Sequence, residues 1–84
     1  MYTVAWLPEA ALEFANVWLH LDPNQQAAVL AELKVFKQAL VADPFGHGES
    51  REHGTRVMFE APLGIRYRLE GDGYTVSILR VWRY

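Results

Sequence analysis

An apolar residue recurs with helical spacing twice in the first half of the chain, and this limits how the chain can fold. Each series repeats at i, i+4, i+7 and i+11, which places the side chains on one face of an α-helix. The first series is Ala10, Phe14, Val17 and Leu21, and the second is Val29, Leu33, Phe36 and Leu40. We therefore predict two amphipathic helices that must pack against another layer.

The residues around these series mark the ends of both helices. Proline suits the first turn of a helix, so the helices are expected to run from Pro8 to about His20 and from Pro23 to about Ala42. Asp22 and Gln25 have the spacing of a capping box in front of the second helix. The short break between the helices predicts an antiparallel hairpin.

The remaining segments are typical of β-strands. Residues 2–7 form a short β-rich run, and three further runs cover 55–61, 65–70 and 74–84. Residues 46–54 are rich in glycine and charge and are expected to form a polar loop. The element order is then β-α-α-β-β-β, an α+β fold with a two-helix hairpin packed on one face of a small, twisted, mainly antiparallel sheet.

An Asp-Gly pair between the last two runs predicts a hairpin, and its register decides which side chains share a face. In a two-residue turn, Leu69 lies opposite Val76 and Arg66 opposite Leu79, and directly opposed residues share a face. The floor beneath the helices would then be Ile65, Tyr67, Leu69, Val76 and Ile78. A slip of one residue would exchange the two faces.

Arginines occupy the opposite face in this register. Arg66, Arg68 and Arg83 project away from the core, whereas Arg80 falls on the core side. Guanidinium groups bind phosphate bidentately, so this face could bind nucleic acid. It could equally be a sheet surface that arginines keep solvated.

Three aromatic residues of the same tail are candidates for base stacking: Tyr67, Trp82 and Tyr84. Aromatic residues in strands usually belong to the core, and this alternative is strong for Tyr67 and Trp82. The alternative for Tyr84 is a frayed residue at the end of the sequence.

Charge is divided unevenly along the chain, which carries a net charge of −2. All six arginines fall in the last 34 residues, and both lysines fall in the first half. Arginine suits bidentate binding of phosphate and carboxylate better than lysine does. The second half is therefore the better candidate for an anion-binding surface.

Composition excludes several classes of protein. The 84 residues predict a single domain over 1–84. The chain has no cysteine, and the spacing of His20, His47 and His53 fits no ligand pattern, so neither a metal nor another cofactor is expected. No apolar run reaches the roughly 20 residues of a membrane span. We expect a soluble, cytoplasmic protein that does not bind a membrane.

Several segments together resemble one known superfamily. They are "YTVAWLPEA" at the start, "DPF" after the second helix, "IRYRLEGDG" and the closing "VSILRVWRY". With the β-α-α-β-β-β order, they resemble the RelE/ParE superfamily of bacterial toxins from type II toxin–antitoxin modules. The likeness covers essentially the whole chain and is greatest to the YoeB- and RelE-like members.

This resemblance implies a function. RelE- and YoeB-like toxins cut messenger RNA in the ribosomal A site without a metal, so a ribosome-dependent endoribonuclease is implied, with the ribosome, mRNA and a cognate antitoxin as partners. ParE-like members instead inhibit DNA gyrase and have no known catalytic residues. A gyrase inhibitor is thus one alternative, and an inactive relative that binds only an antitoxin is another.

The resemblance also implies roles for particular residues. Arg66 matches the arginine of the family's "YR" and would hold the scissile phosphate. Arg83 stands where YoeB-like chains have histidine; because arginine cannot release a proton at neutral pH, phosphate binding is its implied role. Tyr84 matches the terminal tyrosine of those chains. Arg56 would be a further contact to RNA phosphates, and Arg68 is a phosphate-binding candidate from its place on the arginine face.

The general base of YoeB-like toxins has no direct match. Gly46 occupies the position of their loop acid, and Glu49, or His47 or His53, would have to replace it. Ribosome-directed members are also usually strongly basic, whereas this chain is slightly acidic. Both departures favour the ParE-like alternative or a relative that has lost its nuclease activity.

Overall fold

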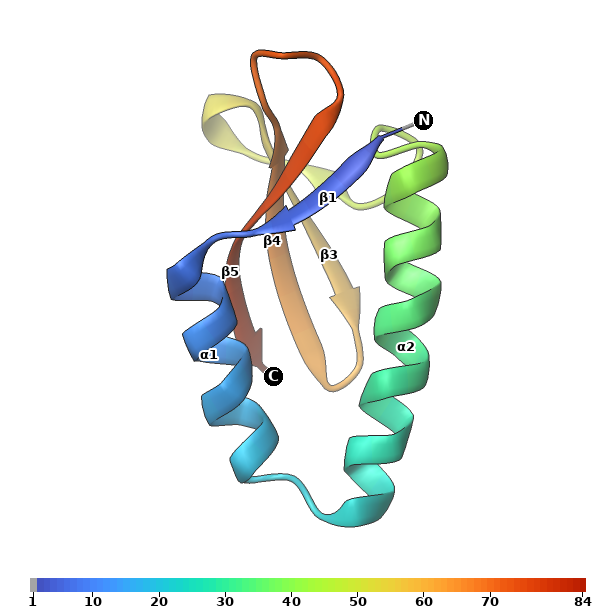
Figure 1. The fold of residues 1–84 in the computed structure, drawn as a ribbon, viewed down its shortest axis with the longest axis vertical. Coiled ribbons are helices and arrows are strands. Elements are labelled where there is room, and N and C mark those ends of the chain that lie inside the picture. Colours follow the sequence, from blue (N-terminus) through green and yellow to red (C-terminus); the bar gives the residue numbers. More distant parts are fainter. Residues whose placement is uncertain (1) are drawn as a thin grey trace.

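Two helices cover one face of a five-stranded sheet in the computed structural model of the chain, which describes residues 2–84 (Figure 1). The strands are β1 (Thr3–Trp6), β2 (Glu49–Ser50), β3 (Thr55–Glu60), β4 (Leu63–Leu69) and β5 (Thr75–Arg83). The helices are α1 (Pro8–Leu19) and α2 (Pro23–Ala42), and a short 3₁₀ turn, η1 (Glu52–Gly54), precedes β3. The predicted α+β class and helix-on-sheet arrangement are confirmed.

The ends of the helices follow the local signals in the sequence. Pro8 and Pro23 each occupy the first turn. The Asp22 carboxylate accepts a hydrogen bond from the Gln25 backbone N–H at 2.8 Å, and the Gln25 side chain accepts one from the Asp22 N–H at 2.9 Å. These reciprocal bonds form the predicted capping box, which satisfies backbone donors that the helix itself leaves free.

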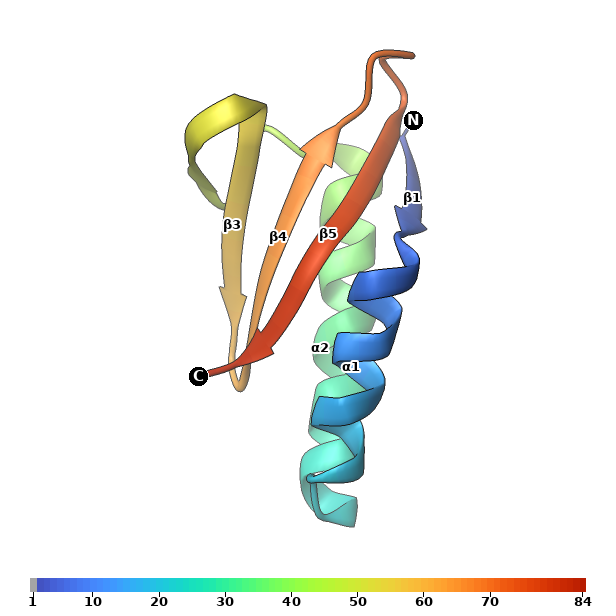
Figure 2. The same cartoon turned by 90° about the vertical axis from the view of Figure 1, so that its left-hand side faces the viewer.

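The sheet is mixed, with strand order β1-β5-β4-β3-β2. β1 pairs with β5 in parallel, and every other pair is antiparallel. β1 covers only the first half of β5, from Thr75 to Ile78. The second half of β5 is therefore a free edge, and α1 runs beside it (Figures 1 and 2).

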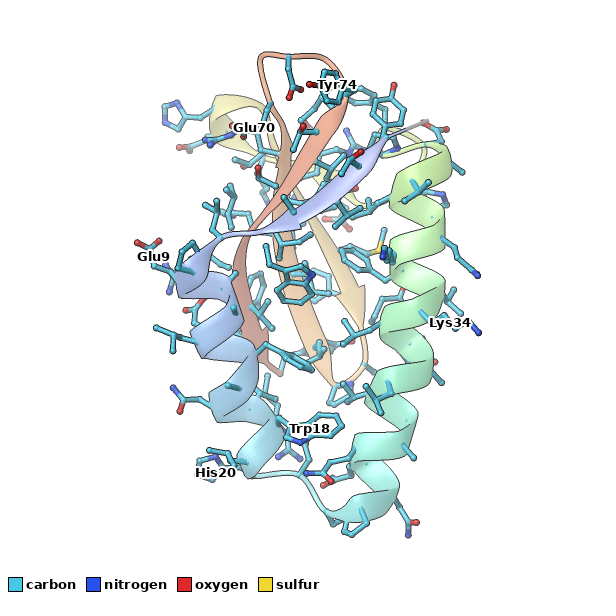
Figure 3. The ribbon with its side chains drawn as sticks, in the orientation of Figure 1. Glu9, Trp18, His20, Lys34, Glu70 and Tyr74 are labelled. Atoms are coloured by element: carbon cyan, nitrogen blue, oxygen red, sulfur yellow. The ribbon has the colours of Figure 1, made fainter. Side chains whose placement is uncertain are left out.

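The end of α1 contacts the start of α2. Phe14 and Trp18 of α1 have ring centroids 5.9 Å apart, and Figure 3 shows Trp18 between α1 and α2. The Gln26 side chain donates a hydrogen bond to the Trp18 carbonyl at 3.1 Å. These contacts lie at the end of the helical hairpin, which projects beyond the sheet (Figure 2).

Tyr67 lies in the core between the helices and the sheet. Its ring packs edge-on against Phe36 of α2, with centroids 6.2 Å apart. Its hydroxyl donates to the carbonyl of Pro44 at 3.0 Å or to that of His47 at 2.8 Å. This hydroxyl therefore binds the segment that follows α2. Burial raises the pKa of Tyr67 above its usual value. Tyr67 is thus a core residue, not a base-stacking one.

Tyr67→Phe is expected to lower the free energy of unfolding by about 1–3 kcal/mol, because it leaves the buried Pro44 carbonyl oxygen without its donor. Urea unfolding followed by circular dichroism would measure the loss. Tyr84→Phe is the control, since Tyr84 is exposed and should change stability by less than about 0.5 kcal/mol. Equal effects of the two variants would contradict this role of the Tyr67 hydroxyl.

The segment predicted as a polar loop contains a fifth strand. Glu49 pairs with Val57 and Ser50 with Arg56, and the Arg51 N–H donates to the Thr55 carbonyl at 2.8 Å. A strand of two residues is too short to show the alternation of side chains that predicts a strand from sequence. β2 forms because β3 offers it an unpaired edge, which is a tertiary effect.

The predicted register of the last hairpin is correct near the turn and wrong beyond it. Tyr67 pairs with Ile78 as expected, but Arg66 pairs with Arg80 because Leu79 is an extra, bulged residue in β5. A bulge shifts the alternation of side chains by one. Val81 therefore joins the core at 2% exposure, and Arg80, predicted on the core side, lies on the opposite face.

Candidate functional site

The face of the sheet away from the helices has no helix over it. Figure 2 shows α1 and α2 on the same side of β3, β4 and β5. We call the other side the open face. Its residues form three rows across the strands, which pass through Gly64, Arg66 and Arg68 of β4.

The central row runs across four strands. It consists of Glu49, Val57, Arg66 and Arg80, each directly opposite the next. Directly opposed residues in neighbouring strands have Cα atoms about 4.5–5.5 Å apart, so the Arg66 and Arg80 guanidinium groups can reach one anion. Buried Val57 separates this arginine pair from the Glu49 carboxylate. The row therefore presents an acid at one end and two cations at the other.

A glutamate of α1 holds Arg80 in place. Both Glu13 carboxylate oxygens accept from the Arg80 Nε at 3.0 Å, and Oε2 accepts from Nη2 at 2.8 Å. The Val81 backbone N–H, at the free edge of β5, donates to Oε1 at 3.0 Å. The hydrogen bond from Arg80 lowers the pKa of Glu13, so the carboxylate is ionised at neutral pH.

Arg66 has a different environment. Within residues 2–84 its side chain makes no ion pair. It lines two shallow pockets of about 260 Å³ each. One is shared with Glu13, Arg80 and Trp82, and the other with Arg51, Glu52, His53 and Thr55. Its positive charge is therefore available to a ligand.

An aromatic row lies beside the arginine pair. Phe59, Gly64 and Trp82 are opposite one another, and the Trp82 ring lies so close to Gly64 that a Cβ there would overlap it. Phe59 contacts Trp82 and Tyr84 edge-on, with centroids 6.2 and 5.2 Å apart. Phe59 and Tyr84 are 48% and 59% exposed. Trp82 is thus on the open face and not in the core.

Tyr84 is fixed in this row, although it ends the sequence. Its N–H donates to the Pro62 carbonyl at 3.0 Å, and its ring packs on Phe59. Pro62 is four residues before Arg66, which corresponds to about 13 Å along a strand. The structure therefore places Tyr84 on the same face as Arg66 but not beside it.

Two of the predicted phosphate-binding residues lie on the other face. Arg83 pairs with the core residue Leu63, so its predicted position beside Arg66 and Arg68 is wrong; the bulge at Leu79 is the cause. Arg56 donates from Nε to the His47 carbonyl at 2.9 Å and from Nη2 to that of Gly48 at 3.1 Å. It anchors the loop before β2.

Arg68 does share the open face with Arg66. Its Nε donates to the Glu70 carboxylate at 2.7 Å, and it lies opposite Thr55 and Ser77. Glu49 also has a partner, since its Oε2 accepts from Arg51 Nη2 at 3.0 Å. The structure therefore brings Glu49, Arg66 and Arg68 onto one face with Tyr84.

Sequence reasoning missed Arg80 and Glu13. The alternation of polar and apolar residues from Thr75 to Ile78 breaks at Leu79, a second apolar residue in succession, and this break could have indicated the bulge that turns Arg80 outward. Glu13 has no local signal, because 67 residues separate it from Arg80. Phe59 was also missed, although its position in the predicted strand over 55–61 is visible in the sequence.

Two further findings concern the chain as a whole. Over residues 2–84, His, Asp and Glu side chains form no group of three that could hold a metal ion. No helix in this part of the chain has the length and apolar character needed to cross a membrane.

Comparison with known proteins gives matches among solved structures. No family model and no curated protein sequence matches the chain. A chain in the crystal structure of the toxin–antitoxin complex RelBE2 from Mycobacterium tuberculosis is 28% identical, with a TM-score of 0.69 and coverage of 99% of this chain and 98% of that one. A chain of the chromosomal ParDE system from P. aeruginosa is 21% identical, with a TM-score of 0.71 and coverage of 99% and 96%.

A third match is the isolated E. coli RelE toxin. It is 11% identical, with a TM-score of 0.64, and the superposition covers 99% of this chain and 84% of RelE. At this identity the likeness concerns the fold alone.

Proposed function

The chain has the fold of the RelE/ParE toxin superfamily, and from this premise we propose that it is the toxin of a bacterial type II toxin–antitoxin module. The proposed partner is a cognate antitoxin. The similar RelBE2 chain comes from a toxin–antitoxin complex, and this supports the assignment. Such a toxin would act in the cytoplasm.

The proposed activity is cleavage of messenger RNA on the ribosome, and the central row of the open face is the observation that supports it. Glu49 supplies a carboxylate on the same face as Arg66 and Arg80. Cleavage at a ribose needs a proton acceptor for the 2′-hydroxyl and positive charge at the phosphate. This row offers both without a metal or other cofactor.

The residues would divide the reaction as follows. Glu49 takes the proton of the 2′-hydroxyl, and the 2′ oxygen attacks phosphorus to form a 2′,3′-cyclic phosphate. The bond from phosphorus to the 5′ oxygen breaks, and this oxygen takes a proton from solvent, because arginine cannot supply one. Arg66 and Arg80 stabilise the charge that develops on the phosphoryl oxygens.

Exposed aromatic rings would hold the message on the same face. Stacking of one base on an aromatic side chain contributes about 1–3 kcal/mol. Tyr84 and Phe59 are both exposed and lie next to the Trp82 row. The separation of about 13 Å between Tyr84 and Arg66 along the sheet suits a neighbouring nucleotide and not the scissile one. Arg68 would contact a further phosphate.

The test is addition of the purified protein to a translating bacterial extract, with message 5′ ends mapped by primer extension. New ends within codons in the A site are expected. Intact message at a large excess of protein would overturn the nuclease activity.

Glu49→Gln is expected to reduce the cleavage rate by about a hundredfold or more, because glutamine cannot accept the 2′-hydroxyl proton. Single-turnover cleavage on programmed ribosomes would measure it. Glu9→Gln is the matched control, since it removes the same charge from an exposed side chain of α1, which points away from the molecule in Figure 3. A fully active Glu49→Gln variant would exclude Glu49 as the base.

The net charge of −2 favours a second function, inhibition of DNA gyrase. Attraction to a polyanion grows with the number of phosphates neutralised, and a ribosome-directed protein gains more from a basic surface than this chain can offer. Inhibition of gyrase supercoiling with message left intact would identify this function. Antitoxin binding without either activity would identify an inactive relative.

A further inference from the structure

Glu13 is an acidic residue beside the arginine pair, and both a side chain and a backbone N–H of β5 bind its carboxylate. It reaches Arg80 around the edge of the sheet, from α1 to β5. One of its oxygens is held by the Val81 backbone N–H, which is part of the strand and cannot rotate away. The carboxylate therefore has a fixed position, set by backbone and not by side chains alone.

The contact occupies one edge of the Arg80 guanidinium and leaves the other free. Nε and Nη2 donate to Glu13, whereas Nη1 makes no hydrogen bond within residues 2–84. Arginine carries five N–H donors in a planar fork, so a second anion can still bind bidentately or through Nη1. The Arg80 side chain is 63% exposed, and that of Glu13 only 29%.

We propose that Glu13 is a positioning residue that fixes Arg80 beside Arg66, so that both guanidinium groups bind one backbone phosphate of single-stranded nucleic acid. This rests on the proposed function of the open face as a phosphate site.

Two physical effects support it. Like charges directly opposite in neighbouring strands repel, so without Glu13 the two arginine side chains would separate. A mobile arginine side chain loses conformational entropy when it binds a phosphate. An arginine that Glu13 already holds in place loses less, so binding is stronger. Both effects predict weaker phosphate binding when Glu13 is removed.

Simple electrostatics predicts the opposite sign. Removing a carboxylate next to a phosphate site raises the local positive charge and should strengthen binding of a polyanion. The sign of the effect therefore separates positioning from charge. Glu9 provides a matched control, because this exposed acid of α1 also acts on Arg80 through its charge but makes no ion pair with it in the described chain.

The experiment measures fluorescence anisotropy of a labelled single-stranded DNA of about 8 nucleotides, a length typical of single-strand sites, with the full-length protein. The DNA lacks the 2′-hydroxyl, so it is not cut. Glu13→Ala is expected to weaken binding about threefold to tenfold, the scale of one ordinary hydrogen bond, whereas Glu9→Ala should leave binding unchanged or slightly stronger. Tighter binding by Glu13→Ala, or equal affinities of the two variants, would overturn the proposal.

Further variants keep the test decisive. If Glu13→Ala is unfolded by circular dichroism, Glu13→Gln retains an acceptor and should give an intermediate loss. In an Arg80→Ala background, removal of Glu13 should weaken binding no further, whereas an unchanged loss would show that Glu13 acts elsewhere. Arg66→Ala reports on the phosphate site itself: if it has no effect on DNA binding, the proposed site fails, whatever Glu13 does.

Discussion

Arg66→Ala is expected to reduce cleavage of ribosome-bound message by about a hundredfold or more, the scale seen when one preorganised donor to a transition-state oxyanion is removed. Arg66 is the central cation of the open face and makes no ion pair within residues 2–84. Its loss removes a positive charge that would stabilise the phosphoryl oxygens, and it leaves no acidic side chain without an ion-pair partner. Single-turnover cleavage on programmed ribosomes would measure the effect.

Arg83→Ala is the matched control for this prediction. It removes the same charge, so both variants lose the same long-range attraction to RNA. Arg83, however, shares the helix-side face with Leu63, and its loss should change cleavage less than about threefold. Equal losses in the two variants would show that total charge matters and that the open face is not the site.

Phe36→Ala is expected to lower the free energy of unfolding by about 3–5 kcal/mol, the usual cost of removing a buried phenylalanine ring. Phe36 is 2% exposed and packs against Tyr67, so the cavity would open between α2 and β4. Natural domains have only about 5–15 kcal/mol of stability, and small ones are near the lower end. A substantial unfolded fraction is therefore expected in the absence of denaturant.

Urea unfolding followed by circular dichroism measures this loss, and the preceding residue supplies the control. Val35 is 58% exposed on the same helix, and Val35→Ala should change stability by less than about 0.5 kcal/mol. A small effect of Phe36→Ala would mean that the contact between α2 and the sheet does not hold the fold together.

The helices and most of the sheet could be predicted from the sequence because their signals are local. Asp22 and Gln25 form the capping box that their spacing predicts, and Phe36 and Leu40 of the second apolar series are buried. The Asp-Gly turn sets the pairing of Leu69 with Val76 correctly. Each of these features depends on residues within about one helical turn or one hairpin of each other.

The composition of the open face was predictable only in part. Arg66 and Arg68 were placed on it correctly, because they lie on β4, whose alternation is unbroken. Arg83 was placed there wrongly and Arg80 was excluded, because both follow the bulge at Leu79. One inserted residue exchanges inward and outward side chains over the rest of a strand.

The sequence by itself determined the two helices, the order of the helices and the four longer strands, and the half of the chain that carries the arginines. Only the tertiary structure decided which arginines meet. Arg80 faces Arg66 because β5 bulges against β4, and Glu13 holds Arg80 because α1 packs along the edge of β5 that β1 leaves free. Periodicity and capping act between near neighbours in the chain, whereas strand register and helix–sheet contacts form between segments far apart in it, and no local pattern encodes them.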